Sequence, residues 1–188
     1  ASDVYKRQVY GRPSAQILDL PLASDGVLAH APWLAATARP WPGALAVNRR
    51  TGSSAFSFNR LIEARATMGV LTGPVRAGPL NRFDRGSVVE VLLTTGDLSS
   101  VSEEELLQGA NAAAIGSMET GWEIIQFARA ELVAARRYRL SLLLRGRSGS
   151  EPEMLALRPE GQRFVLLDEA VVQPQLSIAQ GALAQEWR

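Results

Sequence analysis

The segment that most constrains this chain lies at residues 138–145, where two sets of side chains alternate. One set comprises Tyr138, Leu140, Leu142 and Leu144, and the other comprises Arg139, Ser141, Leu143 and Arg145. A period of two is typical of a half-buried β-strand. Two shorter strand candidates precede it, at residues 122–127 and 131–134. The segment 109–149 therefore predicts a three-stranded antiparallel meander that ends at Arg145 and Gly146.

Short strand candidates fill most of the remaining chain and are separated by turns rich in glycine and proline. One of them, residues 87–94, is apolar on both faces, which predicts a central strand buried on two sides. A capping box of Ser102 and Glu105 predicts a helix, and residues 177–180 repeat that pattern. We therefore expect a mainly β fold, an antiparallel β-sandwich or open barrel, with one short helix at about residues 102–108.

The composition excludes several classes of protein. The chain has 188 residues with a net charge of +1, so no strong overall field would attract it to nucleic acid. It has no cysteine and a single histidine, which excludes disulfides, thiolate metal sites and zinc sites built from several imidazoles. No apolar run reaches the roughly 18–20 residues that span a bilayer. We expect no cofactor and no bound metal.

The ends of the chain suggest that it is a fragment. Residues 1–8 read like a translated sequencing adapter, and we treat them as an artefact. Residues 9–42 read as the end of a preceding region and a connector, because two prolines flank Trp41. Residues 43–175 are predicted to form a C-terminal β-domain, and residues 176–188 a truncated C-terminal segment.

Two groups of residues are candidates for binding a partner. The first is an arginine cluster around the alternating strand, which suits an anionic partner surface or simply a solvated strand face: Arg137, Arg139, Arg145 and Arg147. The second is a set of tryptophans, which suits glycan stacking or ordinary core packing: Trp33, Trp41 and Trp122. Both interpretations stay open for each group.

Candidate catalytic groups are scattered. His30 has no cysteine or second histidine to act with, and we expect it to be non-catalytic. Four carboxylates are possible glycosidase acids, although no spacing pairs them: Asp84, Glu90, Glu119 and Glu123. Asp84 lies between Arg82 and Arg85, which predicts a local ion pair in a loop that precedes a strand. We therefore expect no enzyme site in this chain.

Several strings in a fixed order carry a resemblance to a known family. They are Pro-Trp-Pro-Gly-Ala-Leu-Ala-Val (40–47), Asn-Arg-Phe-Asp-Arg-Gly (81–86), Leu-Leu-Gln-Gly-Ala-Asn-Ala-Ala-Ala-Ile-Gly (106–116), Gly-Trp-Glu-Ile-Ile-Gln-Phe (121–127), Leu-Leu-Arg-Gly-Arg-Ser-Gly (143–149) and Phe-Val-Leu-Leu-Asp (164–168). Together they resemble the C-terminal part of the large baseplate hub ("megatron") protein of gene transfer agents and siphophage-like tails. The resemblance covers most of residues 40–188, and residues 9–39 look like the end of the preceding tail-hub region.

This resemblance implies a structural protein of the virion tail tip, assembled in the bacterial cytoplasm and released in the particle. It implies contacts with the distal tail protein and with further hub copies in a trimer, and a role in host contact. Full-length relatives carry a glycoside-hydrolase-like barrel upstream, which is absent here, and no catalytic residue is implied for this region. Two alternatives remain: a carbohydrate-binding or adhesive β-sandwich that recognises host surface glycans, and a cell-wall hydrolase.

Overall fold

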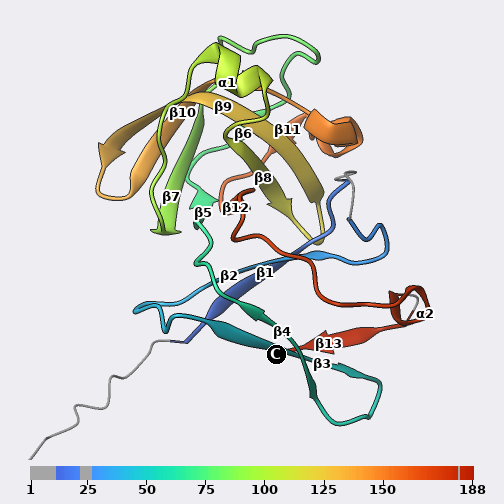
Figure 1. Ribbon diagram of the computed structural model, residues 1–188. Helices are drawn as coiled ribbons and strands as arrows, with labels where there is room; N and C mark the ends of the chain where they lie inside the picture. The colour runs from blue at the N-terminus through green and yellow to red at the C-terminus, as the bar shows by residue number, and fades with distance from the viewer. Residues whose placement is uncertain (1–11, 22–26, 182) are drawn as a thin grey trace, which may run out of the picture.

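A computed structural model describes residues 12–21, 27–181 and 183–188, and its centre is a closed β-barrel. Six strands form it: β5 (Met68–Leu71), β7 (Val89–Thr95), β8 (Ala112–Ser117), β9 (Gly121–Ala134), β10 (Arg137–Leu144) and β12 (Arg163–Leu166). Their order is β10-β7-β5-β12-β8-β9, and every neighbouring pair is antiparallel (Figure 1). The predicted mainly β class is confirmed, and the barrel is closed rather than open. The adapter-like residues 1–8 lie outside the described residues.

The barrel interior is filled by apolar side chains from all six strands. In β7, Val89, Val91 and Leu93 point inward and are fully buried, whereas Leu92 is partly exposed on the outer face. The prediction that this strand is buried on two sides is therefore wrong, because only its inner face meets the core. Phe127 and Phe164 meet across the interior with ring centroids 6.5 Å apart. Full burial of such a side chain stabilises the fold by roughly 1.5–3 kcal/mol.

The predicted meander differs from the structure in two respects. Residues 121–134 form the single long strand β9 rather than two short ones, and its residues 126–134 pair with β10. In β10, Leu142 has a positive φ of 55°. Tyr138 and Leu140 precede this residue and face the barrel core, and Leu143 follows it and also faces that core, while Leu142 packs in an outer cluster. The alternation therefore changes face at Leu142.

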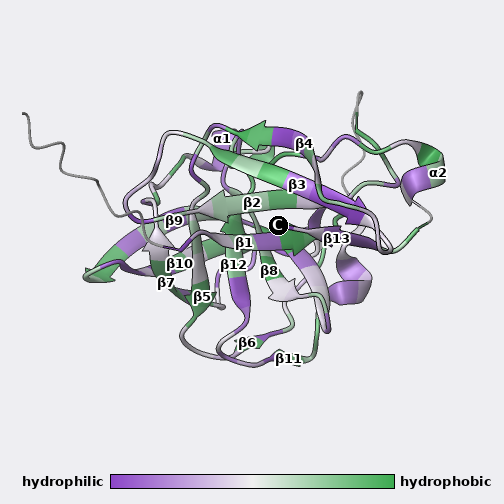
Figure 2. Cartoon of the chain, turned by 90° about the horizontal axis from the view of Figure 1, so that it is seen from below, coloured by the Kyte–Doolittle hydropathy of each residue, from purple (hydrophilic) through white to green (hydrophobic). Residues whose placement is uncertain are grey.

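Below the barrel lies a second layered region, which we call the basal module (residues 12–21, 27–65, 172–181 and 183–188). It contains the antiparallel pair β1 (Ser14–Leu18) and β2 (Trp33–Thr37), and a sheet of β3 (Leu45–Thr51), β4 (Ser57–Ile62) and β13 (Gln185–Trp187) in the order β13-β3-β4 (Figures 1 and 2). The β13–β3 pairing crosses the predicted boundary between residues 175 and 176. The predicted domain limits stay a prediction.

The pair β1–β2 forms a middle layer between the barrel and the lower sheet. Leu18 and Ala35 belong to a cluster shared with barrel residues such as Ile124. Leu34 and Ala36, which alternate with Ala35 along β2, belong to a different cluster with Ile62 and other residues of the lower sheet. Each face of β2 is therefore covered, and the two regions share a continuous apolar contact.

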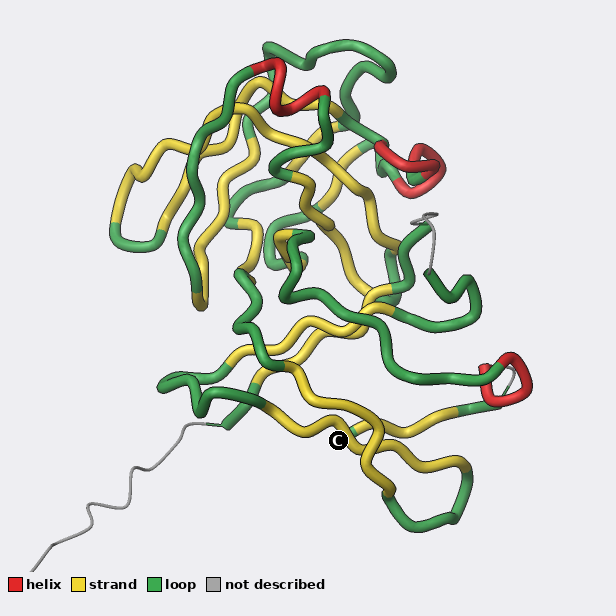
Figure 3. Tube along the Cα trace, in the orientation of Figure 1, coloured by secondary structure: helices red, strands yellow, loops and turns green. Residues whose placement is uncertain are grey.

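Short helices and turns lie at the edges of the molecule (Figure 3). The predicted helix is confirmed as α1 (Glu103–Leu107): Glu105 N donates to Ser102 Oγ at 3.2 Å, and Ser102 N donates to Glu105 Oε2 at 2.8 Å. These bonds from Ser102 hold the pKa of Glu105 below its usual value. The turn expected after Ser177 is present as α2 (Ile178–Gly181).

The remaining short elements are two 3-10 turns, η1 (Arg147–Gly149) and η2 (Glu151–Glu153), and a strand pair, β6 (Val75–Arg76) with β11 (Leu157–Arg158). Among the described residues, none of the helices has the length and apolar character needed to cross a membrane.

Candidate functional site

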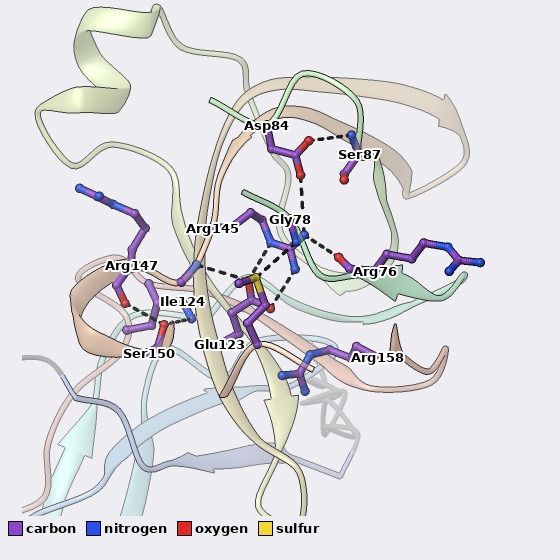
Figure 4. Close-up of polar contacts among 12 residues, drawn as sticks. Arg76, Gly78, Asp84, Ser87, Glu123, Ile124, Arg145, Arg147, Ser150 and Arg158 are labelled. Atoms are coloured by element: carbon purple, nitrogen blue, oxygen red, sulfur yellow. Dashed lines mark hydrogen bonds and ion pairs between the residues drawn. The ribbon is translucent and has the colours of Figure 1, made fainter. Parts of the chain in front are cut away.

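The most distinctive polar feature of the barrel is a buried ion pair between Arg145 and Glu123 (Figure 4). Glu123 lies on β9 and Arg145 directly follows β10, so the pairing of these two strands brings the side chains together. Arg145 Nε donates to Glu123 Oε1 at 2.7 Å, and its second terminal nitrogen donates to Glu123 Oε2 at 3.0 Å. Each side chain is only 1% exposed. This is the paired, bidentate geometry that a buried guanidinium requires.

Asp84 joins this ion pair from the loop before β7. Its Oδ1 accepts hydrogen bonds from the backbone N–H groups of Gly86 at 3.1 Å and Ser87 at 2.9 Å. Its Oδ2 lies 3.9 Å from Arg145 Nη1. Burial alone would raise the pKa of Asp84, but the hydrogen bonds from Ser87 and Gly86 and the charge of Arg145 outweigh it and lower that pKa.

The structure corrects the predicted local ion pair of this loop. Asp84 pairs with Arg145, which is distant in the sequence, and not with its neighbours Arg82 or Arg85. Arg85 instead forms an ion pair with Glu103 at the start of α1, with 3.4 Å between Arg85 Nη2 and Glu103 Oε1. The backbone of Asp84 also bonds that of Leu143 in both directions, at 2.8 and 2.9 Å. The loop therefore fixes the position of β7 against β10.

The backbone near Gly78 closes over the same ion pair. The carbonyl of Arg76 accepts a hydrogen bond from Arg145 Nη1 at 2.8 Å. A Cβ atom on Gly78 would overlap Asp84 Oδ2 and would lie 3.1 Å from Arg145 Nη1. Only a residue without a side chain fits this position without displacing the ions. We call Arg145, Glu123 and Asp84 the ion cluster.

A second buried arginine, Arg158, lies close to the ion cluster and is 1% exposed. Its terminal nitrogens donate to backbone carbonyls, at 2.6 Å to Glu153 and 3.4 Å to Gly121. Burial lowers the pKa of Arg158, and the negative charge of Glu123 opposes that shift. Sequence reasoning missed this residue, because nothing around it distinguishes a buried arginine from a surface one. The pairing of β11 with β6 places it.

The arrangement is suited to holding the barrel together. Both carboxylates of the ion cluster accept several hydrogen bonds, and the Arg145 guanidinium is shared between Glu123, Asp84 and a backbone carbonyl. Its members come from three separate parts of the chain. The described residues hold no group of three metal-ligating side chains of the His, Cys, Asp and Glu types.

The four candidate arginines do not form one surface. Arg145 is buried, so its predicted place on an exposed strand face is wrong, because the change of face at Leu142 turns it inward. Arg137 and Arg139 remain on the outer face, where both form ion pairs with Glu90. Arg137 Nη2 lies 3.5 Å from Glu90 Oε2, and Arg139 Nη2 lies 3.4 Å from Glu90 Oε1. Arg147 lies beyond the opposite end of β10 and donates to Gln126 Oε1 at 3.1 Å. A partner surface at the three remaining arginines stays a prediction.

The tryptophans do not form a platform either. Trp122 is 2% exposed and packs in the cluster between the barrel and β1–β2, with Trp33 partly buried against the same cluster. Trp41 is partly buried against the other cluster, below β2. Trp122 is therefore not available for stacking on a glycan, and of its two interpretations the structure supports core packing.

The other polar candidates have structural partners or stand apart. His30 Nε2 lies 2.9 Å from the carbonyl oxygen of Leu176 and joins two segments of the basal module. Glu90 pairs with the outer arginines, and Glu119 is an exposed turn residue. Of the four carboxylates considered as acids, only Asp84 and Glu123 converge, and they converge on Arg145.

Comparison with known proteins gives one family. The family described as "Rcc01698-like, C-terminal" matches residues 66–165 of the chain. These residues are more than half of the chain and include nearly the whole barrel and the ion cluster. No curated protein matches the chain. On the strength of this match, the chain belongs to the Rcc01698-like, C-terminal family.

Proposed function

We propose that this chain is a structural component of a phage-like, gene-transfer-agent tail baseplate hub, where it contributes to assembly of the tail tip. Membership of the Rcc01698-like family is consistent with this role. The more specific hub assignment rests on the ordered strings that resemble the baseplate hub protein, from residues 40–47 to residues 164–168.

One observation carries the proposal. Three of the strings that resemble the hub protein meet at the ion cluster: Asp84 comes from residues 81–86, Glu123 from residues 121–127 and Arg145 from residues 143–149. Strings that served a binding site would be expected to present exposed side chains. These strings instead supply a buried contact of ion pairs that holds three parts of the barrel together. That is the pattern expected of a scaffold.

In this role the barrel is a rigid building block, and its partners contact it from outside. The expected partners are the distal tail protein and further copies of the hub in a trimer. The exposed outer face around Arg137 and Arg139 is one candidate contact, because these arginines form a row of exposed ion pairs with Glu90 and Glu131. The expected location is the tail of the particle, with host contact as a further role of the tip.

The alternatives receive no specific support. A glycan site built on tryptophan stacking would need exposed rings on one face, and these rings belong to two different core clusters. A hydrolase would need a free acid and base across a cleft, and the two carboxylates that converge are both held by Arg145. We therefore assign no catalytic step to this chain.

The proposal is tested by locating the protein in particles. Antibodies raised against the purified chain are applied to particles from the producing cells and viewed by electron microscopy, with antibodies against a capsid protein as the control. We expect label at the distal end of the tail. Particles that lack the protein, or label restricted to the capsid, would contradict the proposal.

A further inference from the structure

The strands of the basal module form a ring that is open at one place. The sheet β13-β3-β4 continues through side chains of β4 to residues 173–175: Asn59 Nδ2 donates to the Gln175 carbonyl at 2.7 Å, and Arg60 donates to the Gln173 carbonyl. Val172 and Leu34 exchange backbone hydrogen bonds of 2.7 and 3.0 Å, which connects this segment to β2 and so to β1. The ring therefore ends at β1 on one side and at β13 on the other.

Between these two ends lies an apolar groove of about 250 Å³. Side chains from both ends of the ring and from its inner faces line it, including Ile17, Leu34, Ala36, Val47, Ile62 and Trp187. Seen from below, the end of β13 lies alongside β1 (Figure 2). For scale, an aliphatic cavity of about 150 Å³ holds a benzene molecule. The groove therefore has room for more than one aliphatic side chain.

The two strands that border the groove are sheet edges. Within the described residues, β1 pairs only with β2, and β13 pairs only with β3. An edge strand presents unpaired N–H and C=O groups, which pair readily with another extended chain. The barrel has no such edge because its sheet is closed. A small apolar ligand would cover the floor of the groove and leave both edges unpaired, whereas an extended chain would satisfy both.

The excess of positive charge in the basal module, together with Arg188 at the groove itself, adds a second constraint on the occupant. The described basal module carries seven arginines: Arg12, Arg39, Arg49, Arg50, Arg60, Arg65 and Arg188. Against them stand three acidic residues: Asp19, Glu63 and Glu186. The guanidinium of Arg188, which borders the groove, lies over the ring of Phe56 at 4.5 Å, without a carboxylate partner among the described residues. An occupant with acidic side chains on its solvent face would complement this field.

We propose that the groove accepts one extended β-strand from a separate partner chain. That strand alternates aliphatic side chains, which fill the groove, with polar or acidic side chains, which face solvent. Its backbone pairs with β1 on one side and with β13 on the other and so closes the ring. This acceptor role goes beyond the tail assignment and does not depend on it, because it rests only on the edges, the groove and the charges of the basal module.

A strand attached to the full chain tests the acceptor directly. An Asn-Gly turn after Arg188 is followed by six residues that alternate valine and threonine, placed so that valine faces the groove. The control has the same composition shifted by one residue, which turns every valine to solvent. The readout is amide hydrogen exchange in β1, which a hairpin formed on β13 alone would not protect.

We expect exchange in β1 to slow by at least about tenfold with the valine-inward strand, and to be unchanged with the shifted strand. A second variant, Ala36→Phe, fills the groove and should abolish this protection while exchange in β7 of the barrel stays as in the parent chain. Equal protection by both attached strands, or no protection of β1 by either, would overturn the proposal. The particle labelling would be unaffected by that outcome, so the two proposals fail separately.

Discussion

The barrel and the basal module are both built from short antiparallel strands, but they differ in how far their sheets close. The barrel closes on itself through six backbone ladders and holds three distant segments with the ion cluster. The basal module closes only part of its ring, partly through side chains, and leaves two edges beside an apolar groove. We infer from this difference that the barrel is the stable scaffold of the chain and that the basal module can accept another strand.

The largest effect should follow from breaking the ion cluster. In Arg145→Met, Glu123 and Asp84 stay buried without their cation, so we expect a loss of about 3–5 kcal/mol in the free energy of unfolding. Chemical denaturation measures it. The matched control is Arg139→Met on the exposed face, where the expected loss is about 0–1 kcal/mol. Equal losses in the two variants would show that the cluster does not hold the barrel.

The close approach at Gly78 should give the next largest effect. In Gly78→Ala the new methyl group would displace Asp84 or Arg145, and we expect a loss of about 1–3 kcal/mol. Gly73→Ala is the control, because nothing lies within 4 Å of the position its methyl group would take. Thermal unfolding of both variants checks the difference, and a stable Gly78→Ala protein would mean that the ions relax freely.

Acid should weaken the barrel through Asp84. Its pKa is lowered in the folded chain, so its contribution to stability is present above its unfolded pKa of about 3.9 and is lost as the pH falls through the folded value. We expect the free energy of unfolding to fall more steeply below about pH 4 in the parent chain than in Asp84→Asn. Denaturation at pH 6 and pH 3 measures both slopes, and identical slopes would contradict the assignment.

The smallest effect is expected at the groove, and its sign should distinguish the two regions. Ala15→Val adds volume at the open groove and favours the strand conformation, so we expect a gain of about 0.5–1 kcal/mol. Ala113→Val adds the same volume inside the closed barrel, where Ala113 is fully buried, and should cost about 1–3 kcal/mol. Denaturation of the two variants settles the signs; a loss at both positions would mean that the groove is already filled.

The structural features that could be predicted from the sequence are those that depend on residues close together along the chain. The mainly β class followed from short alternating runs, and helix α1 followed from Ser102 and Glu105, which need only three residues to form a capping box. The long strand β9 was divided in the prediction because residues 128–130 are not strongly apolar, yet pairing with β10 carries the strand through them.

What could not be predicted depends on contacts between distant residues. Arg145 falls on the polar side of a regular alternation, and only the positive φ at Leu142 and the presence of Glu123 across the strand pair turn it inward. The burial of Trp122 likewise depends on β1 and β2, which pack beneath the barrel. No local pattern at residues 15–17 or 187 indicates that they border one groove, because that requires the ring of the basal module.

The contrast between a closed barrel and an open basal module is tested most directly by residue-resolved hydrogen exchange of the full chain. Amides in β7 and β8 should exchange only through global unfolding, whereas the outer amides of β1 and β13 should exchange through local opening, on the order of a hundredfold or more faster. Uniform exchange across both regions would contradict the account, because it would mean that the basal module is as fully closed as the barrel.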